Sequence, residues 1–376
     1  MNILIAPNSF KESLSSHEIT DIITQSLSSF SNKFQTIPLP LADGGSGFLE
    51  VMTQALHGKY VKVRVFGPLG TRLHARYGMC QKQKAAVLEL AQAAGLNRIP
   101  PRKRNPLRTS TIGVGHLIRA AIREGARTIL LGIGDSATID CGIGALAALG
   151  IRFLDADGAE IPLNCRGLLK LQHIDRSHMM EALHKAKITV AADVDNTLTG
   201  QNGALMYARQ KGATPRMLPI INKALRRFKK VVYATTKTDL DAIPGSGAAG
   251  GIGGAFSALL NASLVNGFSL VRKTVHLDRY MKQADCVITG EGMIDHKSRY
   301  GKTALQVLEI ARTNKKPVIL VVADTADTTS TYTDYGVVRI FALTDRHTKK
   351  YAMTHARHVL HGMAPRIAQY LDTRVQ

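Results

Sequence analysis

The chain alternates between short apolar segments and amphipathic segments, and this alternation constrains its fold most strongly. Runs such as Thr128–Ile133 have the length and composition of buried strands. Apolar residues spaced three and four apart within Val114–Ile122 predict a helix. Strands that alternate with helices favour the α/β class, built around a largely parallel sheet. The expected strands are Met1–Ala6, Thr36–Ala42, Tyr60–Phe66, Thr128–Ile133, Ile188–Val194, Cys286–Thr289, Pro317–Ala323 and Val337–Leu343.

The length indicates more than one domain. With 376 residues the chain exceeds an average domain of roughly 150 residues, so two domains are expected. No low-complexity linker separates two halves, which favours interleaved domains over domains in series. Helices are also expected after Ser15 or Ser16 as N-cap and over Met353–Leu371.

The net charge is unusual, because the chain has 49 Lys and Arg residues but 28 Asp and Glu residues, which gives +21. Such an excess can indicate nucleic-acid or membrane-surface binding. The basic residues are spread along the chain, however, with short clusters only at Arg102–Arg104 and Arg226–Lys230. We therefore favour a basic solvated surface and expect neither a specific nucleic acid nor a membrane as partner.

The first residues, the apolar runs and the cysteines indicate in which cellular compartment the protein is expected. Met1–Ala6 is apolar without a basic segment before it, so a secretory signal is not expected. No apolar run reaches the roughly 18 residues of a membrane helix. The four cysteines are scattered without a C-x-x-C pair, which favours reduced thiols over disulfides or a zinc site. These patterns predict a cytoplasmic protein.

Small and acidic residues follow several expected strands. In open α/β sheets the carboxyl ends of the strands form the ligand-binding edge. One acidic residue there could simply cap the next helix, but several together favour a polar cleft that handles phosphate and metal. The loops concerned are Asn8–Lys11, Asp43–Gly47, Gly134–Asp140, Asp193–Asn196 and Gly290–Asp295.

Two nucleotide-binding motifs match only in part. Gly245–Gly250 fits G-x-G-x-x-G but follows Asp241–Pro244 instead of a strand, so close helix packing and ligand contact stay equal alternatives. Gly301–Thr303 resembles the end of a Walker A loop, but His296 stands where its first glycine is required. Lys302 can still meet a phosphate at a helix start.

The carboxylates are candidates for phosphoryl transfer. That reaction needs a cation to neutralise phosphate charge and a group to orient the attacking hydroxyl, and Mg²⁺ favours carboxylate oxygens. Asp193, Glu291 and Asp295 each follow an apolar strand and are the candidate metal ligands. The turn that contains Gly134 and Ser136 is a candidate phosphate cradle, with an ordinary tight turn as the alternative.

The loops together resemble the type I glycerate kinase family. The motifs occur in the order of that family and span residues 3 to about 325, so they are specific as a set although each is weak alone. They are Ala6–Lys11, Leu41–Gly45, Gly67–Gly70, Gly132–Thr138, Gln210–Ala213, Gly247–Gly251 and Ile288–Gly292.

The resemblance implies a fold and an activity. It implies a discontinuous flavodoxin-like parallel-sheet domain, expected at residues 1–66 plus 285–376, and an inserted mixed α/β domain at 67–284. It also implies ATP, Mg²⁺ and D-glycerate as ligands, with 2-phosphoglycerate as the favoured product, and it leaves a homodimer open.

The resemblance also places the expected site residues. The catalytic candidates are Asp193, Asp43 and Lys11. The nucleotide-binding candidates are Gly134, Ser136, Glu291 and Lys302.

Several positions depart from the family pattern, among them Ile139, Thr197, Ala208, Arg209 and Met293, and three bear most on activity. The resemblance implies Asp at position 8, Glu at 46 and Gly at 135, where this chain has Asn8, Ser46 and Asp135. The alternative to an active kinase is therefore a catalytically weak relative that binds ligand. A third reading, a basic nucleic-acid-associated protein, rests on the net charge alone.

Overall fold

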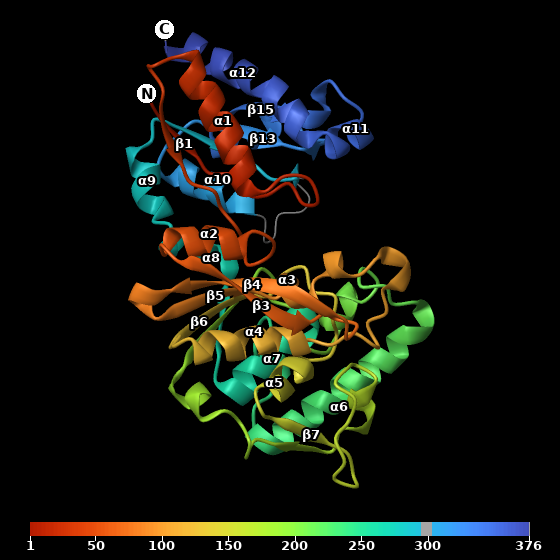
Figure 1. Cartoon of the computed structure of the whole chain (residues 1–376). Helices are drawn as coiled ribbons and strands as arrows, with labels where there is room; N and C mark the ends of the chain where they lie inside the picture. Colours follow the sequence, from red (N-terminus) through yellow and green to blue (C-terminus); the bar gives the residue numbers. More distant parts are fainter. Residues whose placement is uncertain (295–302, 376) are drawn as a thin grey trace. The chain divides into compact units, whose positions relative to one another are not determined.

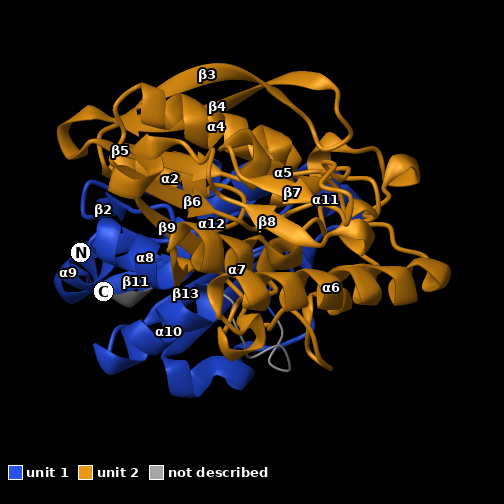
Figure 2. Ribbon diagram, turned by 90° about the horizontal axis from the view of Figure 1, so that it is seen from below, with its two compact units in different colours: residues 1–43, 268–376 blue, residues 44–267 orange. Residues whose placement is uncertain are grey.

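The structure is a computed structural model that describes residues 1–294 and 303–375 (Figure 1). The chain divides into two compact units (Figure 2). Unit 1 combines Met1–Asp43 with Phe268–Gln376, and unit 2 is Gly44–Gly267. Unit 1 is thus assembled from both ends of the chain.

The secondary structure follows the expected alternation. The helices are α1 (Ser16–Phe30), α2 (Phe48–Ala55), α3 (Ala91–Ala94), α4 (Ile112–Arg123), α5 (Ile143–Ala148), α6 (Leu218–Thr236), α7 (Ala248–Leu260), α8 (Gly267–Thr274), α9 (Leu277–Gln283), α10 (Thr303–Thr313), α11 (Lys349–Thr354) and α12 (Ala356–Val375). The strands are β1 (Asn2–Ile5), β2 (Gln35–Pro38), β3 (Lys59–Phe66), β4 (Arg72–Cys80), β5 (Ala85–Glu89), β6 (Thr128–Gly132), β7 (Arg152–Leu154), β8 (His173–Asp175), β9 (Lys187–Ala192), β10 (Ser263–Asn266), β11 (Cys286–Thr289), β12 (Met293–Ile294), β13 (Val318–Val322), β14 (Asp324–Thr325) and β15 (Val337–Ala342).

Unit 1 contains a five-stranded sheet with the order β15-β13-β11-β1-β2. Every neighbouring pair in this sheet is parallel. β13 is buried along its whole length, as a strand covered on both faces must be. In this order, β2 lies on one side of β1, and the later strands β11, β13 and β15 lie on its other side. This reversal is the kind of switch point at which α/β sheets bind ligands.

Helices α1 and α12 pack together against one face of this sheet. Their apolar residues, including Ile19, Ile23 and Leu360, form one buried cluster with Ile288 and Ile319 of the strands. Helix α1 begins with a capping box, in which Ser15 accepts from the Glu18 backbone while the Glu18 side chain accepts from Ser15 N. The predicted cap at Ser15 is therefore confirmed.

Unit 2 contains a six-stranded mixed sheet with the order β10-β9-β6-β5-β4-β3. The strands from β10 to β5 are parallel, and β4 and β3 continue as antiparallel strands with β3 at the edge. The amphipathic helix α4 packs on β3, β4 and β5, and its residues Val114, Leu117, Ile118 and Ala121 are buried. The long segment between β6 and β9 contributes a small two-stranded antiparallel sheet of β7 and β8.

Most strand predictions agree with the structure, and one needs correction. The α/β class and a parallel sheet formed by both chain ends are confirmed, because β1 pairs with β11. The segment Tyr60–Phe66 was expected in the terminal domain, but as part of β3 it pairs with β4 in the mixed sheet. The compact units also have bounds that differ from the predicted 1–66 plus 285–376 and 67–284. That these units are independent domains stays a prediction.

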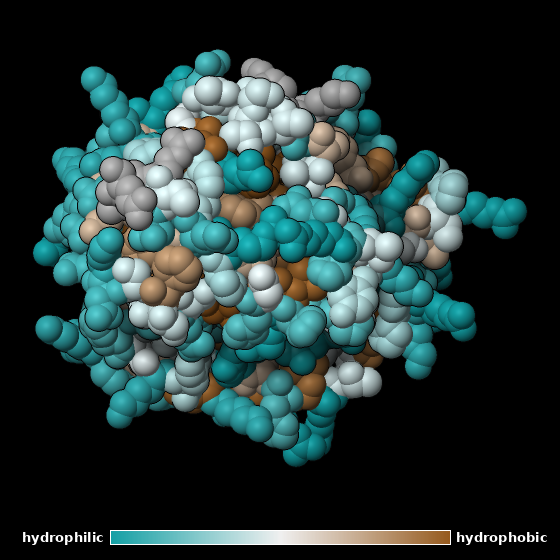
Figure 3. All heavy atoms as spheres, turned by 90° about the horizontal axis from the view of Figure 1, so that it is seen from above, coloured by the Kyte–Doolittle hydropathy of each residue, from teal (hydrophilic) through white to brown (hydrophobic). Residues whose placement is uncertain are grey.

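The face seen in Figure 3 is mainly polar, and the cysteines are buried. One face of the molecule shows mainly hydrophilic side chains with apolar ones scattered between them (Figure 3). Within residues 1–294 and 303–375, no helix combines the length and apolar character needed to cross a bilayer. All four cysteines are free thiols and buried.

Candidate functional site

The carboxyl edge of the five-stranded sheet places Asn8 at the switch point. Asn8 follows β1, is 5% exposed, and donates its backbone N–H to the Gly290 carbonyl after β11 (2.8 Å). Its Nδ2 donates to Asp43 Oδ2 (3.2 Å) and to Thr303 Oγ1 (3.1 Å), and its Oδ1 accepts from the Ser9 N–H. Three distant chain segments therefore meet around one amide side chain.

Two further candidates lie in the same unit. Glu291 directly follows Gly290 and is 8% exposed. Gly290 is required there, because a Cβ would lie 1.6 Å from the Val321 carbonyl oxygen. Lys11 lies after β1 with an exposed side chain, and its backbone nitrogen passes close to Gly292. The structure thus brings Lys11, Asp43 and Glu291 to loops at one edge of this sheet.

Two predicted residues lie outside the described part of the chain. These are Asp295, a candidate metal ligand, and Lys302, a candidate phosphate contact. The neighbouring Thr303 is described, is fully buried, and starts α10.

In unit 2 the turn after β6 carries Gly134 and Ser136. Gly134 donates its N–H to the Gly44 carbonyl (3.0 Å), and a Cβ at Gly134 would lie 2.4 Å from Gly45 Cα. The N–H of Ala137 is donated to Ala94. Both backbone amides are therefore already hydrogen-bonded to carbonyl groups, so an anion at this turn would need other hydrogen-bond donors.

The departures at positions 46 and 135 form a pair. Asp135 Oδ2 accepts from the Ser46 hydroxyl (2.7 Å) and from the Ser46 N–H (3.1 Å). Asp135 adopts φ 56°, a left-handed conformation that Asp tolerates better than most residues. The resemblance implies a carboxylate on residue 46 and none on 135, and this chain carries the carboxylate on 135 instead.

Beneath this turn lies Lys211, a buried ammonium group that we did not predict as a site residue. Lys211 is 6% exposed, and its Nζ donates to Ser136 Oγ (3.0 Å) and to the Thr138 carbonyl (2.8 Å). Burial lowers the pKa of Lys211 to about 7, although the Asp140 carboxylate opposes this shift. The motif Gln210–Ala213 contained this lysine, but nothing in the sequence indicated that it is buried against Ser136.

Asp140 is a buried acidic residue that acts electrostatically on Lys211. It is fully buried, and Oδ2 accepts from both the N–H and the hydroxyl of Thr111 (2.7 Å each), while Oδ1 accepts from the Gly142 N–H (3.1 Å). Burial raises the pKa of Asp140, and these hydrogen bonds oppose that shift. Asp140 therefore ties the loop after β6 to the start of α4.

The glycine-rich segment packs tightly on both loops. Gly250 has φ 75°, and a Cβ there would lie 2.2 Å from the Thr138 carbonyl oxygen. The Ala249 carbonyl accepts from Ser136 Oγ (3.3 Å), and the Gly247 N–H is donated to the Asn196 carbonyl (2.9 Å). A 3-10 turn over Leu240–Ala242 precedes the segment, as expected for a sequence that is not a dinucleotide motif. Close packing is therefore one reason for these glycines.

Asp193 follows β9 and is half-buried. The Tyr207 hydroxyl donates to Asn196 Oδ1 (3.0 Å), and its pKa is raised first by burial and then by the carboxylates of Asp193 and Asp195. Since backbone bonds tie this loop to the glycine-rich segment, the loops after β6 and β9 belong to one cluster. The cluster contains Ser136, Asp193 and Lys211.

Glu89 is a second residue that the prediction missed. It ends β5, is 4% exposed, and accepts from the Leu49 N–H at the start of α2 (3.2 Å). Burial, with further contributions from the Glu50 and Asp135 carboxylates, raises its pKa to about 8. The sequence signal was an apolar run, Ala85–Leu88, that ends in an acidic residue.

The described residues contain no preformed metal cluster. Within 1–294 and 303–375, no three His, Cys, Asp or Glu side chains are grouped so that they could hold a metal ion. The assignment of Asp193, Glu291 and Asp295 as metal ligands therefore stays a prediction.

The fold and these loops define an α/β protein whose polar and ionisable side chains gather at the carboxyl ends of parallel strands, where such proteins bind ligands. The model of the glycerate kinase family matches residues 3–372. The chain belongs to this family of enzymes, so the resemblance inferred from the motifs is confirmed.

Individual relatives agree with the family model. A glycerate kinase of Bacillus cereus is 38% identical over 349 residues, covering 93% of this chain and 92% of the relative. Glycerate 2-kinase of Escherichia coli is 38% identical over 344 residues, covering 91% and 90%. The crystal structure of a candidate glycerate kinase 2 from Salmonella typhimurium LT2 is similar with a TM-score of 0.84 and 38% identity, covering 100% of this chain and 99% of that chain.

Proposed function

We propose that this protein transfers the γ-phosphoryl group of ATP to D-glycerate, with 2-phosphoglycerate as the product. The observation that carries the proposal is the match to a kinase family over residues 3–372. The parallel order of the five strands, with its reversal beside β1, supports the flavodoxin-like assignment of unit 1.

Membership in a kinase family implies ATP as the donor, and the side chains fit a phosphorylated ligand. Lys211 supplies a desolvated ammonium group beside Ser136, and a nearby anion would favour its charged form. Asp193 and Glu291 supply oxygen donors of the kind that Mg²⁺ prefers. Bound Mg²⁺ would neutralise charge on the transferred phosphate.

The roles of the individual residues follow from their chemistry. We assign Asp193 and Glu291, together with Asp295, to holding the metal or orienting the glycerate hydroxyl. Asp43 supports the loop after β1 through Asn8, and Lys11 and Lys302 meet the substrate carboxylate or phosphate. Gly134 and Ser136 shape the turn above Lys211, so Lys211 is a positioning residue for that turn.

A coupled assay of ADP release tests the activity. With D-glycerate, ATP and Mg²⁺ we expect turnover that stops when glycerate or Mg²⁺ is omitted. Analysis of the product by NMR distinguishes 2-phosphoglycerate from the 3-phosphate isomer. Absence of turnover with a folded protein would favour the catalytically weak relative.

The variant Asp193→Asn tests the site. Removing one preorganised electrostatic contact typically lowers the rate by about 10²–10³, so turnover and catalytic efficiency should fall together. Asp157→Asn, which neutralises an exposed carboxylate in the same unit, is the matched control and should keep normal activity. If Asp193→Asn also keeps normal activity, Asp193 is only a loop residue.

A further inference from the structure

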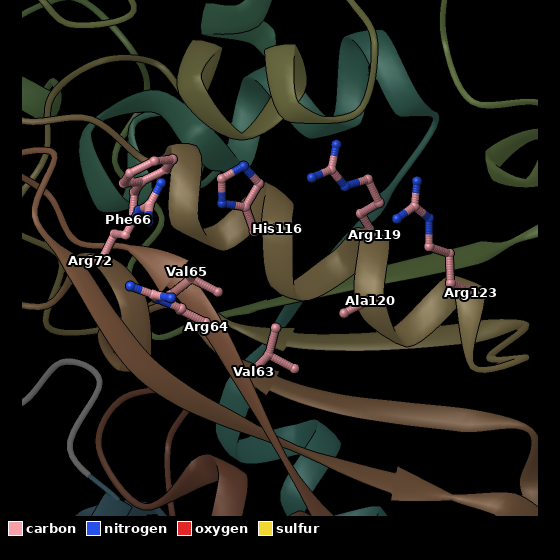
Figure 4. A pocket seen from close by; sticks show the side chains of 9 residues that line it. All are labelled: Val63, Arg64, Val65, Phe66, Arg72, His116, Arg119, Ala120 and Arg123. Atoms are coloured by element: carbon pink, nitrogen blue, oxygen red, sulfur yellow. The ribbon is translucent and has the colours of Figure 1, made fainter.

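A basic cavity lies at the edge of the mixed sheet, on β3, β4 and α4 (Figure 4). Its volume is about 400 Å³, within the usual range for small-molecule pockets. The lining is made of apolar residues, one histidine and four arginines: Val63, Arg64, Val65, Phe66, Arg72, His116, Arg119, Ala120 and Arg123. No acidic side chain belongs to this lining.

The lining draws its cations from both the helix and the sheet. On α4, His116, Arg119 and Arg123 are spaced three and four residues apart, so they share one face of the helix. On the sheet, Phe66 of β3 pairs in register with Arg72 of β4. The Arg72 guanidinium lies 5.9 Å from the Phe66 ring centre, and the His116 ring lies 5.6 Å from it on centres.

Among the described residues, no ion pair compensates the positive charge in this cavity. None of the four guanidinium groups forms an ion pair with any residue in the described ranges. Burial and the Arg119 charge both lower the pKa of His116, which agrees with a positive local field. Like charges that line one cavity repel one another, and an anion bound there would relieve that repulsion.

Protection of the sheet edge explains only part of the cluster. β3 is an edge strand, and charges there discourage pairing with other chains, which accounts for Arg64. It does not account for Arg119 and Arg123, which lie on a helix. The use of arginine is also informative, because the planar guanidinium binds phosphate through two parallel hydrogen bonds.

We propose that this cavity binds a multiply charged phosphorylated small molecule. A small ligand is favoured over nucleic acid because the four arginines line a hollow of about 400 Å³. In addition, Phe66, the single aromatic ring other than His116 in the lining, lies under the Arg72 guanidinium and is not free to stack on a base. The lining shares no residue with the loops assigned to phosphoryl transfer. Its occupant would stabilise unit 2 by mass action.

Hydrogen-exchange mass spectrometry with inorganic tripolyphosphate tests the proposal on the full chain. We expect slower exchange in peptides covering β3, β4 and α4. In the double variant Arg64→Gln/Arg119→Gln, the half-saturating concentration for this protection should rise about tenfold or more for each lost charge-assisted contact. Arg226→Gln, which removes an exposed charge on α6, is the matched control and should leave it unchanged.

Three outcomes would overturn the proposal. The first is protection confined to the strand-end loops, and the second is protection of β3 and α4 that is equal in the double variant. The third is a short single-stranded DNA that protects the same peptides and displaces tripolyphosphate, which would make the cavity part of a nucleic-acid surface. Circular dichroism of the variants separates lost binding from lost folding.

Discussion

At the scale of single residues, the amide of Asn8 explains how the chain tolerates a departure from the family pattern. Its Nδ2 donates to Asp43 Oδ2 at 3.2 Å, which only a donor can do. A carboxylate at position 8 would face the Asp43 carboxylate at this distance, and two such groups cannot both ionise without a proton or a cation between them. The amide therefore gives a hydrogen-bonded pair with a single carboxyl group where the family pattern implies two acids.

This contact sharpens the expectation for Asn8→Asp. With chelator present, we expect the variant to lose about 1–3 kcal/mol of unfolding free energy, the usual cost of a buried group that loses its partner. Mg²⁺ should raise its melting temperature more than that of the parent protein. At saturating ATP and Mg²⁺ its turnover should be higher, because a second carboxylate can help to hold the metal.

Asn8→Ala is the control for this prediction, since it removes the same donor without adding charge. Its stability should fall without any response to Mg²⁺. Equal responses of the two variants to Mg²⁺ would show that position 8 only shapes the loop.

At the scale of elements, the start of α7 holds the loops of unit 2 in place by close backbone packing. Residues Ala249, Gly250 and Gly251 have left-handed dihedral angles inside this segment. Gly250 lies against the Thr138 carbonyl, the same group that accepts from Lys211. The glycine-rich segment thus fixes the wall that buries the ammonium group.

Gly250→Ala tests this packing. A Cβ would lie 2.2 Å from the Thr138 oxygen, so the loop must shift in addition to the strain of a left-handed alanine. Gly125→Ala is the matched control, because Gly125 has φ 100° with nothing within 4 Å of its Cβ position. We expect Gly250→Ala to cost about 1–3 kcal/mol more in denaturant unfolding than the control. Equal losses would mean that backbone strain alone sets the cost.

The elements also show what sequence could and could not predict. The continuous apolar run Val318–Val322 identified a buried strand, because both faces are covered, whereas the shorter apolar run of β5 was missed. β4 was missed, since Arg72, His74 and Arg76 interrupt its apolar pattern on an exposed face. β3 was found but given to the wrong sheet, because only its pairing with β4 shows which sheet it joins.

The residues of the candidate site also include some that sequence could predict and some that it could not. The strand-end positions of Asp193 and Glu291 could be predicted, because local sequence marks where a strand ends. Asp43 was expected directly after a strand over Thr36–Ala42, but β2 ends at Pro38 and Asp43 lies in the loop beyond it. The contacts of Asn8 with Thr303 and of Lys211 with Ser136 could not, since each joins residues far apart in sequence. Burial of Lys211 and Glu89 follows from the same tertiary packing.

At the scale of the whole molecule, buried ionisable groups make stability depend on pH in opposite directions. Lys211 has a pKa of about 7 in the folded protein and 10.5 as its ordinary value, so the unfolded chain binds more protons between these values. The titration of Lys211 therefore makes the free energy of unfolding rise with pH between these two values. Glu89 has a raised pKa, so the folded protein holds its proton more tightly than the unfolded chain.

The variant Glu89→Gln isolates the second effect. From its ordinary pKa of 4.5 to about 8, Glu89 ionises in the unfolded chain but stays protonated in the folded protein, so stability falls as pH rises. The slope is about 1.4 kcal/mol per pH unit at most, and the total is on the order of a few kcal/mol. Glutamine keeps an oxygen that can accept from the Leu49 N–H but cannot ionise. In denaturant unfolding the variant should therefore match the parent below pH 4.5 and exceed it increasingly up to pH 8.

Glu181→Gln, at an exposed position, should show no such divergence. Parallel curves for Glu89→Gln and the parent would mean that Glu89 ionises in the folded protein as it does in water.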